Sequence, residues 1–338
     1  MAPSIPIDIP AILKEVADIE GAVNTPISVS LYIDSTALGE VAAFVRTAFS
    51  SEGANVRVSV QYVDGSPVIA DPTNDMAVIV AGFGDWIGRE AARLRAAGVP
   101  VMVVSATPDL TDEMAQAFGN AIPAGDLISP KASSGSGLGR VVFESVLEVA
   151  GLKVPSVPMP ESVDGVFSFD SVAKEALAMR MGQWVVAACA DKKLAFALAF
   201  GFVRRPLASD LVRANSIQNA GIGAVVFIPG ADMPLMTLNQ ARMLLQIAAA
   251  YGKPMSIERA KELAFVVGGA FACRSAARQI VGLVPGLGWA AKAGIAYAGT
   301  EAMGHAAIEY FEAGGDAAGL AGIMSKTIEF ASQIARGR

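Results

Sequence analysis

The feature that most constrains the fold is a regular alternation of strand-like and helix-like segments over residues 27–150. Two of the strand-like runs, MAVIVAG and VPVMVV, are continuously apolar, which is typical of central strands buried on both faces. Segments with helical spacing of apolar residues separate the runs. Such β–α repetition predicts a doubly wound, mostly parallel sheet. The predicted strands are ISVSLYI (27–33), NVRVSVQYV (55–63), MAVIVAG (76–82), VPVMVV (99–104) and GDLIS (125–129), and the last predicted helix covers 138–151.

One connection departs from this repetition. Asp64-Gly65 follows the second predicted strand, and this dipeptide is typical of a tight hairpin turn. We therefore expect PVIA (67–70) to pair back on the strand at 55–63.

Beyond residue 151 the pattern changes. Residues 152–171 contain three prolines and few periodic apolar positions, which predicts a linker. The rest of the chain is rich in Ala and Gly, and its only strand-like run, GAVVFI (223–228), is explained equally well by a buried helix. The sequence thus predicts an N-terminal amphipathic helix or tail (1–24), an α/β domain (25–151), a Pro-rich linker (152–171) and an all-helical bundle (172–338).

Charge and cysteine usage limit the classes of function. The formal net charge is −6, with an acidic first half and a basic, more apolar second half. The acidic half argues against nucleic-acid binding, and the basic half suits an anionic membrane surface or an acidic neighbouring domain. Cys189 and Cys273 stand in apolar surroundings, which indicates buried thiols in a reducing cytosol. No basic region followed by an apolar run opens the chain, so we expect a cytoplasmic protein, with association to the inner face of the cell membrane left open.

The loop after the first strand tests for phosphate binding. A phosphate-binding loop needs G-x-x-x-x-G-K-[ST] at this place, because its glycines and Lys surround the phosphates and its hydroxyl holds Mg²⁺. Here the chain has DSTALGEV, in which Gly39 stands at the second glycine. Asp34 replaces the first glycine, Glu40 the lysine and Val41 the hydroxyl. A negative charge in place of the lysine removes an attraction to the triphosphate and adds a repulsion, each on the order of several kcal/mol at an effective dielectric of about 20. This excludes an ordinary site of this kind.

The later loops follow the order of the motifs of a GTPase. DPTN stands where a GTPase has D-x-x-G, ATPD where it has N-K-x-D, and SPK where it has S-A-K. Residues 25–150 thus resemble an Era-like small GTPase domain in degenerate form. The departures argue against GTP binding by the usual mode and against hydrolysis. The alternative is an unrelated Rossmann-like or flavodoxin-like domain whose loops happen to align. The resemblance implies nucleotide-site positions at Asp34, Gly39, Glu40, Asp71, Asp109, Ser129 and Lys131.

The helical half carries its own resemblance. IPGAD (228–232), AYG (250–252), VPGLG (284–288) and a small-residue helix ending at Tyr310-Phe311 resemble the YcjF-type domain of unknown function. That domain commonly follows an Era-like GTPase domain and is often described as membrane-associated. The resemblance, over about residues 215–315, implies a membrane-associated domain without a settled biochemical activity.

Whether the helical half contacts lipid is left open by its residues. A membrane-spanning helix needs roughly 20 apolar residues, and every apolar run here is interrupted by Pro, Gly or a charged residue. Basic residues flank LAFALAFGFV (194–203), as expected at a cytoplasmic membrane face. This basic cluster consists of Lys192, Lys193, Arg204, Arg205 and Arg213.

The stretch 281–306 predicts a helical hairpin. Pro285 marks a turn between helices expected at 275–284 and 288–311. Small residues that recur at every fourth position predict close packing of the second helix against protein or lipid. These residues are Ala290, Gly294, Ala298 and Ala302.

One group of residues could bind a metal. Glu301, His305 and Glu309 lie on one helix face, and His305 is the only histidine of the chain. Such a stripe supplies half of a carboxylate-bridged metal site, but no E-x-x-H motif completes it. We predict a solvated or salt-bridged stripe, no metal site and no catalytic residues, since a chain with one histidine is also poorly equipped for acid–base catalysis.

These observations predict a non-catalytic, pseudo-GTPase-like protein that acts in scaffolding or membrane-associated assembly and needs no cofactor. Two alternatives stay open: an atypical nucleotide-binding switch, and a small-molecule-binding Rossmann-like protein that uses the crevice at the carboxyl ends of the strands. For partners, the sequence leaves open a homo-oligomer, another protein or peripheral contact with an anionic membrane, and argues against nucleic acid.

Overall fold

The structure is a computed structural model of the 338-residue chain. It describes residue 17 and residues 19–22, 24–51, 53–130, 169–225, 232–253 and 288–314. Two compact units are present, Pro26–Val203 and Met1–Thr25 with Arg204–Arg338. The predicted helices at 138–151 and 275–284, nearly all of the Pro-rich linker and most of the N-terminal tail lie outside the described residues.

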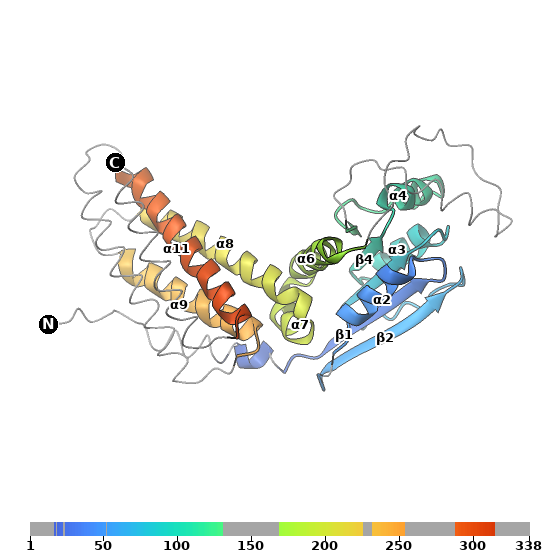
Figure 1. The fold of residues 1–338 in the computed structure, drawn as a ribbon, viewed down its shortest axis with the longest axis horizontal. Helices are drawn as coiled ribbons and strands as arrows, with labels where there is room; N and C mark the ends of the chain where they lie inside the picture. The colour runs from blue at the N-terminus through green and yellow to red at the C-terminus, as the bar shows by residue number, and fades with distance from the viewer. Residues whose placement is uncertain are drawn as a thin grey trace. The chain divides into compact units, whose positions relative to one another are not determined.

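The first unit is built on a parallel five-stranded sheet in the order β2-β1-β3-β4-β5 (Figure 1). β1 pairs along its whole length with β2 on one side and pairs with β3 on the other, so the strand order reverses between β1 and β3. This is the order of flavodoxin-like doubly wound sheets. The predicted α/β class and all five strands are confirmed. The strands are β1 (Ile27–Asp34), β2 (Val56–Val63), β3 (Met76–Ala81), β4 (Val101–Ser105) and β5 (Leu127–Ile128).

The predicted hairpin after β2 is wrong. Residues 64–75 contain no strand, and they carry the chain from β2 across to the far side of β1. Gly65 turns the chain with φ of +96°, and Val68 is then buried in the core. The N–H of Val68 donates to Oε2 of Glu90, a carboxylate that is 2% exposed, at 3.3 Å. This long-range hydrogen bond holds the loop against the sheet, in the place where a crossover helix usually lies.

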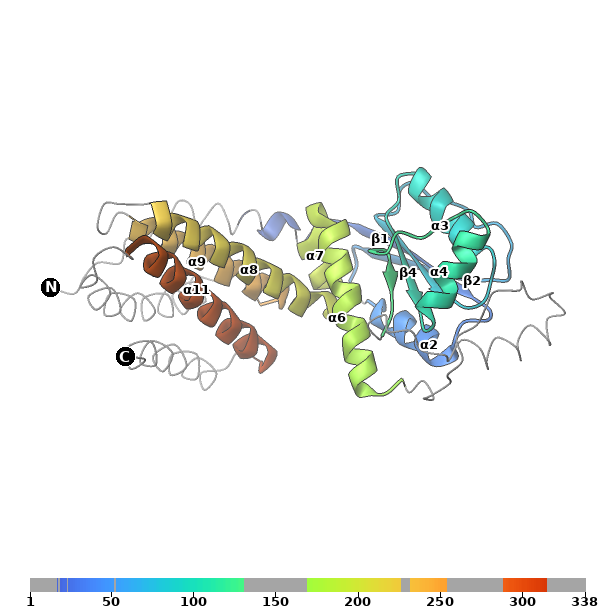
Figure 2. The same cartoon turned by 90° about the horizontal axis from the view of Figure 1, so that it is seen from above.

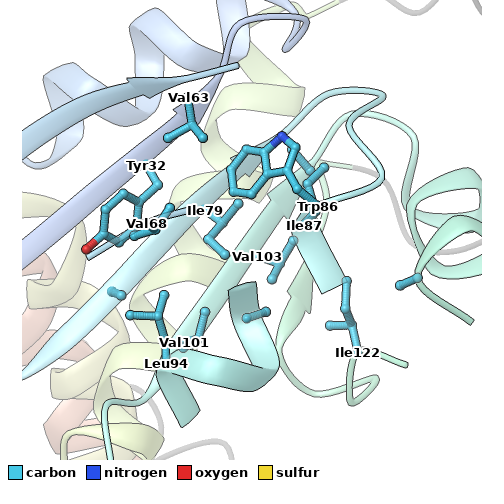
Figure 3. Packing of buried hydrophobic residues seen from close by; sticks show 14 of the residues in the cluster. Tyr32, Val63, Val68, Ile79, Trp86, Ile87, Leu94, Val101, Val103 and Ile122 are labelled. Carbon is cyan, nitrogen blue, oxygen red and sulfur yellow. The ribbon is translucent and has the colours of Figure 1, made fainter. Parts of the chain in front are cut away.

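Helices cover both faces of the sheet (Figure 2). α3 (Ile87–Ala96) and α4 (Pro108–Ala117) lie on one face, and α2 (Gly39–Ala48) and α6 (Ser171–Ala188) on the other. Every residue of β3 and β4 is buried, as the continuous apolar runs predicted. Figure 3 shows the core under α3 and α4, where Tyr32, Val68, Ile79, Trp86, Ile87, Leu94, Val101 and Val103 pack together.

Two helices that the sequence assigned to the helical bundle belong to the α/β unit. α6 begins after Asp170, whose carboxylate caps the helix by accepting a hydrogen bond from the N–H of Ala173 at 2.9 Å. α7 (Lys193–Ala199) follows, and the ring of Phe200 packs on Phe49 with centroids 5.1 Å apart. The boundary between the units therefore falls between Val203 and Arg204 rather than in the predicted linker.

The second unit is helical throughout its described part, as predicted. A buried polar cluster joins its three long helices, because the hydroxyl of Thr300 accepts hydrogen bonds from the amides of Asn219 and Gln240, both at 3.0 Å. All three side chains are inaccessible to solvent. Buried amides need partners, so this cluster fixes how the helices align. The helices are α8 (Gly201–Val225), which begins at the end of the first unit, α9 (Asp232–Ala250) and α11 (Gly288–Glu312). α8 contains the described part of the strand-like run at 223–228.

The packing stripe on α11 differs from the predicted one. Gly294 is exposed with open space around its α-carbon, whereas Ala296, Thr300 and Gly304 are buried. Gly304 lies directly against Val212 of α8, where a β-carbon would overlap the valine side chain. The residues of α11 that pack closely therefore lie two positions along the helix from the predicted ones. Across the described helices, none combines the length and the hydropathy required to cross a bilayer.

This difference predicts opposite effects for the same substitution at two glycines of α11. Gly304→Ala places a methyl group into Val212 and should lower the free energy of unfolding by about 1–3 kcal/mol. Gly294→Ala meets no neighbour and should raise it by about 0.4–1 kcal/mol, because alanine restricts the unfolded chain and favours the helix. Denaturant unfolding of both variants measures these values. Equal effects at the two positions would contradict the packing of α8 on α11.

Candidate functional site

The candidate site lies where the strand order of the sheet reverses. In doubly wound sheets, ligands bind outside the carboxyl ends of the strands at this switch point. Here the switch point lies between β1, which ends at Asp34, and β3, which ends at Ala81. The loops at 35–38 and 82–86 therefore form the site.

The carboxylate of Asp34 joins these two loops. Its Oδ1 accepts hydrogen bonds from the N–H and the hydroxyl of Thr36, both at 2.8 Å. Its Oδ2 accepts from the N–H of Gly84 at 2.9 Å. The Thr36 oxygen in turn accepts from the N–H of Phe83 at 2.8 Å. Phosphate-binding loops offer backbone N–H groups to an anion; in this chain an internal carboxylate, only 3% exposed, accepts them.

Two glycines allow the loops to meet at backbone distance. A β-carbon at Gly82 would overlap the side chain of Thr36 and the backbone next to it. A β-carbon at Gly84 would overlap the carboxylate of Asp34 and the indole of Trp86. The backbone at Gly82 and Gly84 therefore lies directly against Thr36 and Asp34 at the switch point.

Gly39 and Glu40 lie nearby in the first turn of α2. Both residues are exposed. A carboxylate in the first turn of a helix interacts favourably with the helix dipole, typically by about 0.3–1 kcal/mol. Glu40 therefore has a structural role at the position where a phosphate-binding loop has its lysine.

Asp71 does not join this site. It lies in the loop before β3, at the opposite end of the strands, and pairs with Arg57 at 3.1 Å. Its Oδ1 accepts hydrogen bonds from the hydroxyl of Thr73 at 2.6 Å and from the N–H of Thr73 at 2.9 Å. These hydrogen bonds, the hydroxyl first, hold the pKa of Asp71 below its usual value. The structure thus separates Asp71 from Asp34.

Asp71 belongs instead to a polar network on the open face of β1 and β2, which the sequence analysis missed. Arg57 donates to the hydroxyl of Ser28 from Nε at 3.0 Å and from Nη2 at 2.8 Å. Asn74 accepts from the Ser28 hydroxyl at 2.6 Å and donates to Ser30 at 2.9 Å. Ser28 and Ser30, at alternate positions in the first half of β1, were the sequence signal that one face of this strand is polar.

Asp109 and Ser129 lie together at the β5 edge of the sheet. They line a cavity of about 650 Å³ between β5, α4 and α6. Nη1 of Arg180 donates to the carbonyl oxygen of Ser129 at 2.6 Å, and the indole N–H of Trp184 donates to Asp126 at 3.0 Å. This volume lies within the usual range for small-molecule pockets. Lys131 lies outside the described residues.

The Glu–His stripe of α11 forms a side-chain pair. Nε2 of His305 lies 3.0 Å from Oε2 of Glu301, one helical turn earlier, and both His305 and Glu309 are exposed. Over the described ranges, no three His, Cys, Asp or Glu side chains converge as metal ligands would.

The predicted basic cluster is divided between the two units. In the α/β unit, the ammonium of Lys192 pairs with Asp75 at 2.7 Å and donates to the carbonyl oxygen of Pro26 at 3.0 Å. In the helical unit, Arg205 pairs with Glu312 at 3.6 Å. Part of the predicted positive charge is therefore neutralised within each unit. Of the other three residues of the predicted cluster, Lys193 belongs to the first unit and Arg204 and Arg213 belong to the second.

Comparison with known proteins does not extend these observations: no family model, curated protein or solved structure matches this chain. The Era-like and YcjF-type resemblances therefore stay predictions. The site has to be interpreted from its own geometry.

The hydrogen bonds of Asp34 predict a large effect of its removal. Asp34→Ala leaves the N–H groups of Thr36 and Gly84 without their acceptor and should lower the free energy of unfolding by about 2–4 kcal/mol. The matched control is Asp85→Ala, at an exposed acid of the same loop, which should change it by less than about 0.5 kcal/mol. Urea unfolding measures both values. A loss no larger for Asp34 than for Asp85 would show that the carboxylate does not join the loops.

Cys189 offers a chemical test of burial in the α/β unit. Burial raises the pKa of its thiol to about 12, with the nearby Asp75 adding to the effect. In a Cys273→Ser background, we expect native protein at pH 8 to resist thiol alkylation and denatured protein to react fully, because only the thiolate is nucleophilic. Rapid alkylation of the native protein would contradict the packing of α6 on the sheet.

Proposed function

We propose that this chain is a non-catalytic assembly protein. Its α/β unit keeps the architecture of a ligand-binding doubly wound domain but does not bind phosphate at the switch point. Its role is then to hold copies of itself or a partner together, on a membrane surface or in the cytoplasm. The observation that carries the proposal is the carboxylate of Asp34, which accepts hydrogen bonds from the N–H groups of Thr36 and Gly84.

Two energetic effects oppose phosphate binding at the switch point. A phosphate group at the switch point would have to displace Asp34 from three hydrogen bonds, each of which stabilises by about 1.5–3 kcal/mol when the acceptor is charged. It would also lie close to that displaced carboxylate, and two like charges about 4 Å apart repel by about 4 kcal/mol at an effective dielectric of about 20. The lost hydrogen bonds and the charge repulsion both oppose phosphate binding. The loops at 35–38 and 82–86 contain no lysine that would offset them.

The pseudo-GTPase interpretation is a separate element of the proposal. The succession of loops after the strands supports it, while the flavodoxin-like strand order and the position of Asp71 favour the alternative of an unrelated doubly wound domain. The non-catalytic role does not depend on this choice, because it rests on Asp34.

A second candidate function is supported by the cavity beside β5. Its volume of about 650 Å³ suits a small molecule, and Asp109, Arg180 and Trp184 line it. In this case the α/β unit binds its ligand at the edge of the sheet rather than at the switch point.

Calorimetric titration separates these candidates. We expect no binding of GTP, GDP or ATP to the full chain, with or without Mg²⁺, because Asp34 holds the N–H groups that a phosphate would need. Binding at micromolar concentration would contradict the non-catalytic proposal.

A cavity-filling variant then locates any binding that is found. Ala187→Trp fills the cavity beside β5 from the exposed side of α6. Loss of binding in this variant would support the second candidate. Unchanged binding in Ala187→Trp would place the ligand at the switch point and contradict the closed site.

A further inference from the structure

β2 is the edge strand of the sheet next to β1. Within the described part of the chain, β2 pairs only with β1, so the backbone groups along its other side have no strand partner. Proteins usually protect such an edge by shortening the strand, by a bulge, by proline or by charged side chains. β2 has eight residues, VRVSVQYV, with no proline and a single charged residue.

That single charge does not protect the edge. The guanidinium of Arg57 lies over the face of the sheet, where it donates to the hydroxyl of Ser28 at 2.8 Å and pairs with Asp71 at 3.1 Å. The remaining residues of the strand, 58–63, are uncharged. An approaching strand would therefore meet no charged side chain of β2 itself along most of the edge.

Apolar side chains beside this edge are exposed. Val60 is 40% exposed and Tyr62 is 65% exposed, and both lie on the same side of the sheet as α2. Nη1 of Arg46 in α2 donates to the hydroxyl of Tyr62 at 3.1 Å, so the long side chain of Arg46 reaches Tyr62 from the same face of the sheet. Pairing of another strand would bury these side chains as well as satisfy the backbone groups.

We propose that β2 pairs in antiparallel orientation with β2 of a second copy of this chain, which makes one continuous sheet across the two copies. The inference rests on the proposed assembly function and names its partner. A two-fold interface brings the same patch together with itself, so its residues must be self-complementary.

The strand meets this requirement. In an antiparallel pairing centred on Val60, Val58 of one copy lies opposite Tyr62 of the other, and Ser59 lies opposite Gln61. Aromatic–β-branched pairs of this kind stabilise antiparallel sheets, and like charges do not face each other anywhere in 58–62. A register set by these pairs keeps Val58, Val60 and Tyr62 of both copies on one face of the sheet.

The neighbouring helix is compatible with this pairing. In the two-fold arrangement the two α2 helices lie on the same face of the continuous sheet. The exposed side of α2 carries Gly39, Ala43 and Thr47 at intervals of four residues. α2 itself contacts β3, on the inner side of β1, so it leaves the outer edge of β2 accessible to a second copy.

The oligomeric state of the full chain tests the inference. We expect sedimentation equilibrium to show a dimer, and Val60→Lys to weaken dimerisation by roughly tenfold or more, because a lysine on each strand meets its counterpart at the two-fold axis. Ile69→Lys is the matched control: Ile69 is an 82% exposed apolar residue in the loop after β2, away from the edge. This variant should dimerise as the wild type does.

Cysteine cross-linking gives the register directly and does not depend on the stability of the lysine variant. Opposed residues of an antiparallel pair have α-carbons about 4.5–5.5 Å apart, within disulfide range. Val60→Cys should therefore form a covalent dimer on mild oxidation, and Ile69→Cys should not.

Two results would overturn the inference. One is a monomer at every attainable concentration, which would leave a strand of another protein as the occupant of the edge. The other is a dimer that Val60→Lys does not weaken and Val60→Cys does not cross-link. Neither experiment involves a nucleotide, so failure here is distinguishable from failure of the non-catalytic proposal.

Discussion

The three hydrogen bonds of the Asp34 carboxylate hold the two loops at the switch point of the sheet in place. Two of them fix the loop after β1, and the third, from Gly84, joins it to the loop after β3, at a residue fifty positions further along the chain. The glycines at 82 and 84 follow from this contact, because a side chain at either position would push the loops apart. A buried negative charge with satisfied hydrogen bonds then stands where related architectures bind phosphate, and both the fold and the proposed function depend on it.

Local sequence pattern was sufficient where burial alone decides the structure. The apolar runs predicted β3 and β4, and the alternation of strands and helices predicted the parallel sheet. The local sequence pattern gave a wrong prediction where a contact between residues far apart in the chain determines the structure. Asp64-Gly65 favours a hairpin locally, but the hydrogen bond from Val68 to Glu90 on α3 draws the loop across the sheet instead. The prolines before α6 suggested a domain boundary, although α6 packs on the sheet.

The candidate site was likewise predicted where local sequence is sufficient and missed where a long-range contact is needed. Asp34 was singled out from sequence as a misplaced acid in a phosphate-binding loop, and its position at the end of β1 is confirmed. Its hydrogen-bond partner Gly84 could not be predicted, because nothing local to Asp34 indicates which loop the carboxylate will meet. The order of the loops in the sequence predicted that Asp71 shares a site with Asp34. The loop that contains Asp71 instead runs from β2 to the start of β3, so Asp71 lies at the opposite end of the strands from Asp34. Loop order along a chain therefore indicates a shared site only when the topology is also known.

The most direct test of the closed switch point is amide hydrogen exchange measured by NMR at Gly84 and Thr36, with and without excess GTP and Mg²⁺. We expect both amides to exchange slowly and to keep their chemical shifts when the nucleotide is added, because Asp34 accepts their hydrogen bonds in both conditions. Rapid exchange of these amides in the free protein, or shifts that follow the nucleotide concentration, would contradict a site closed by its own carboxylate.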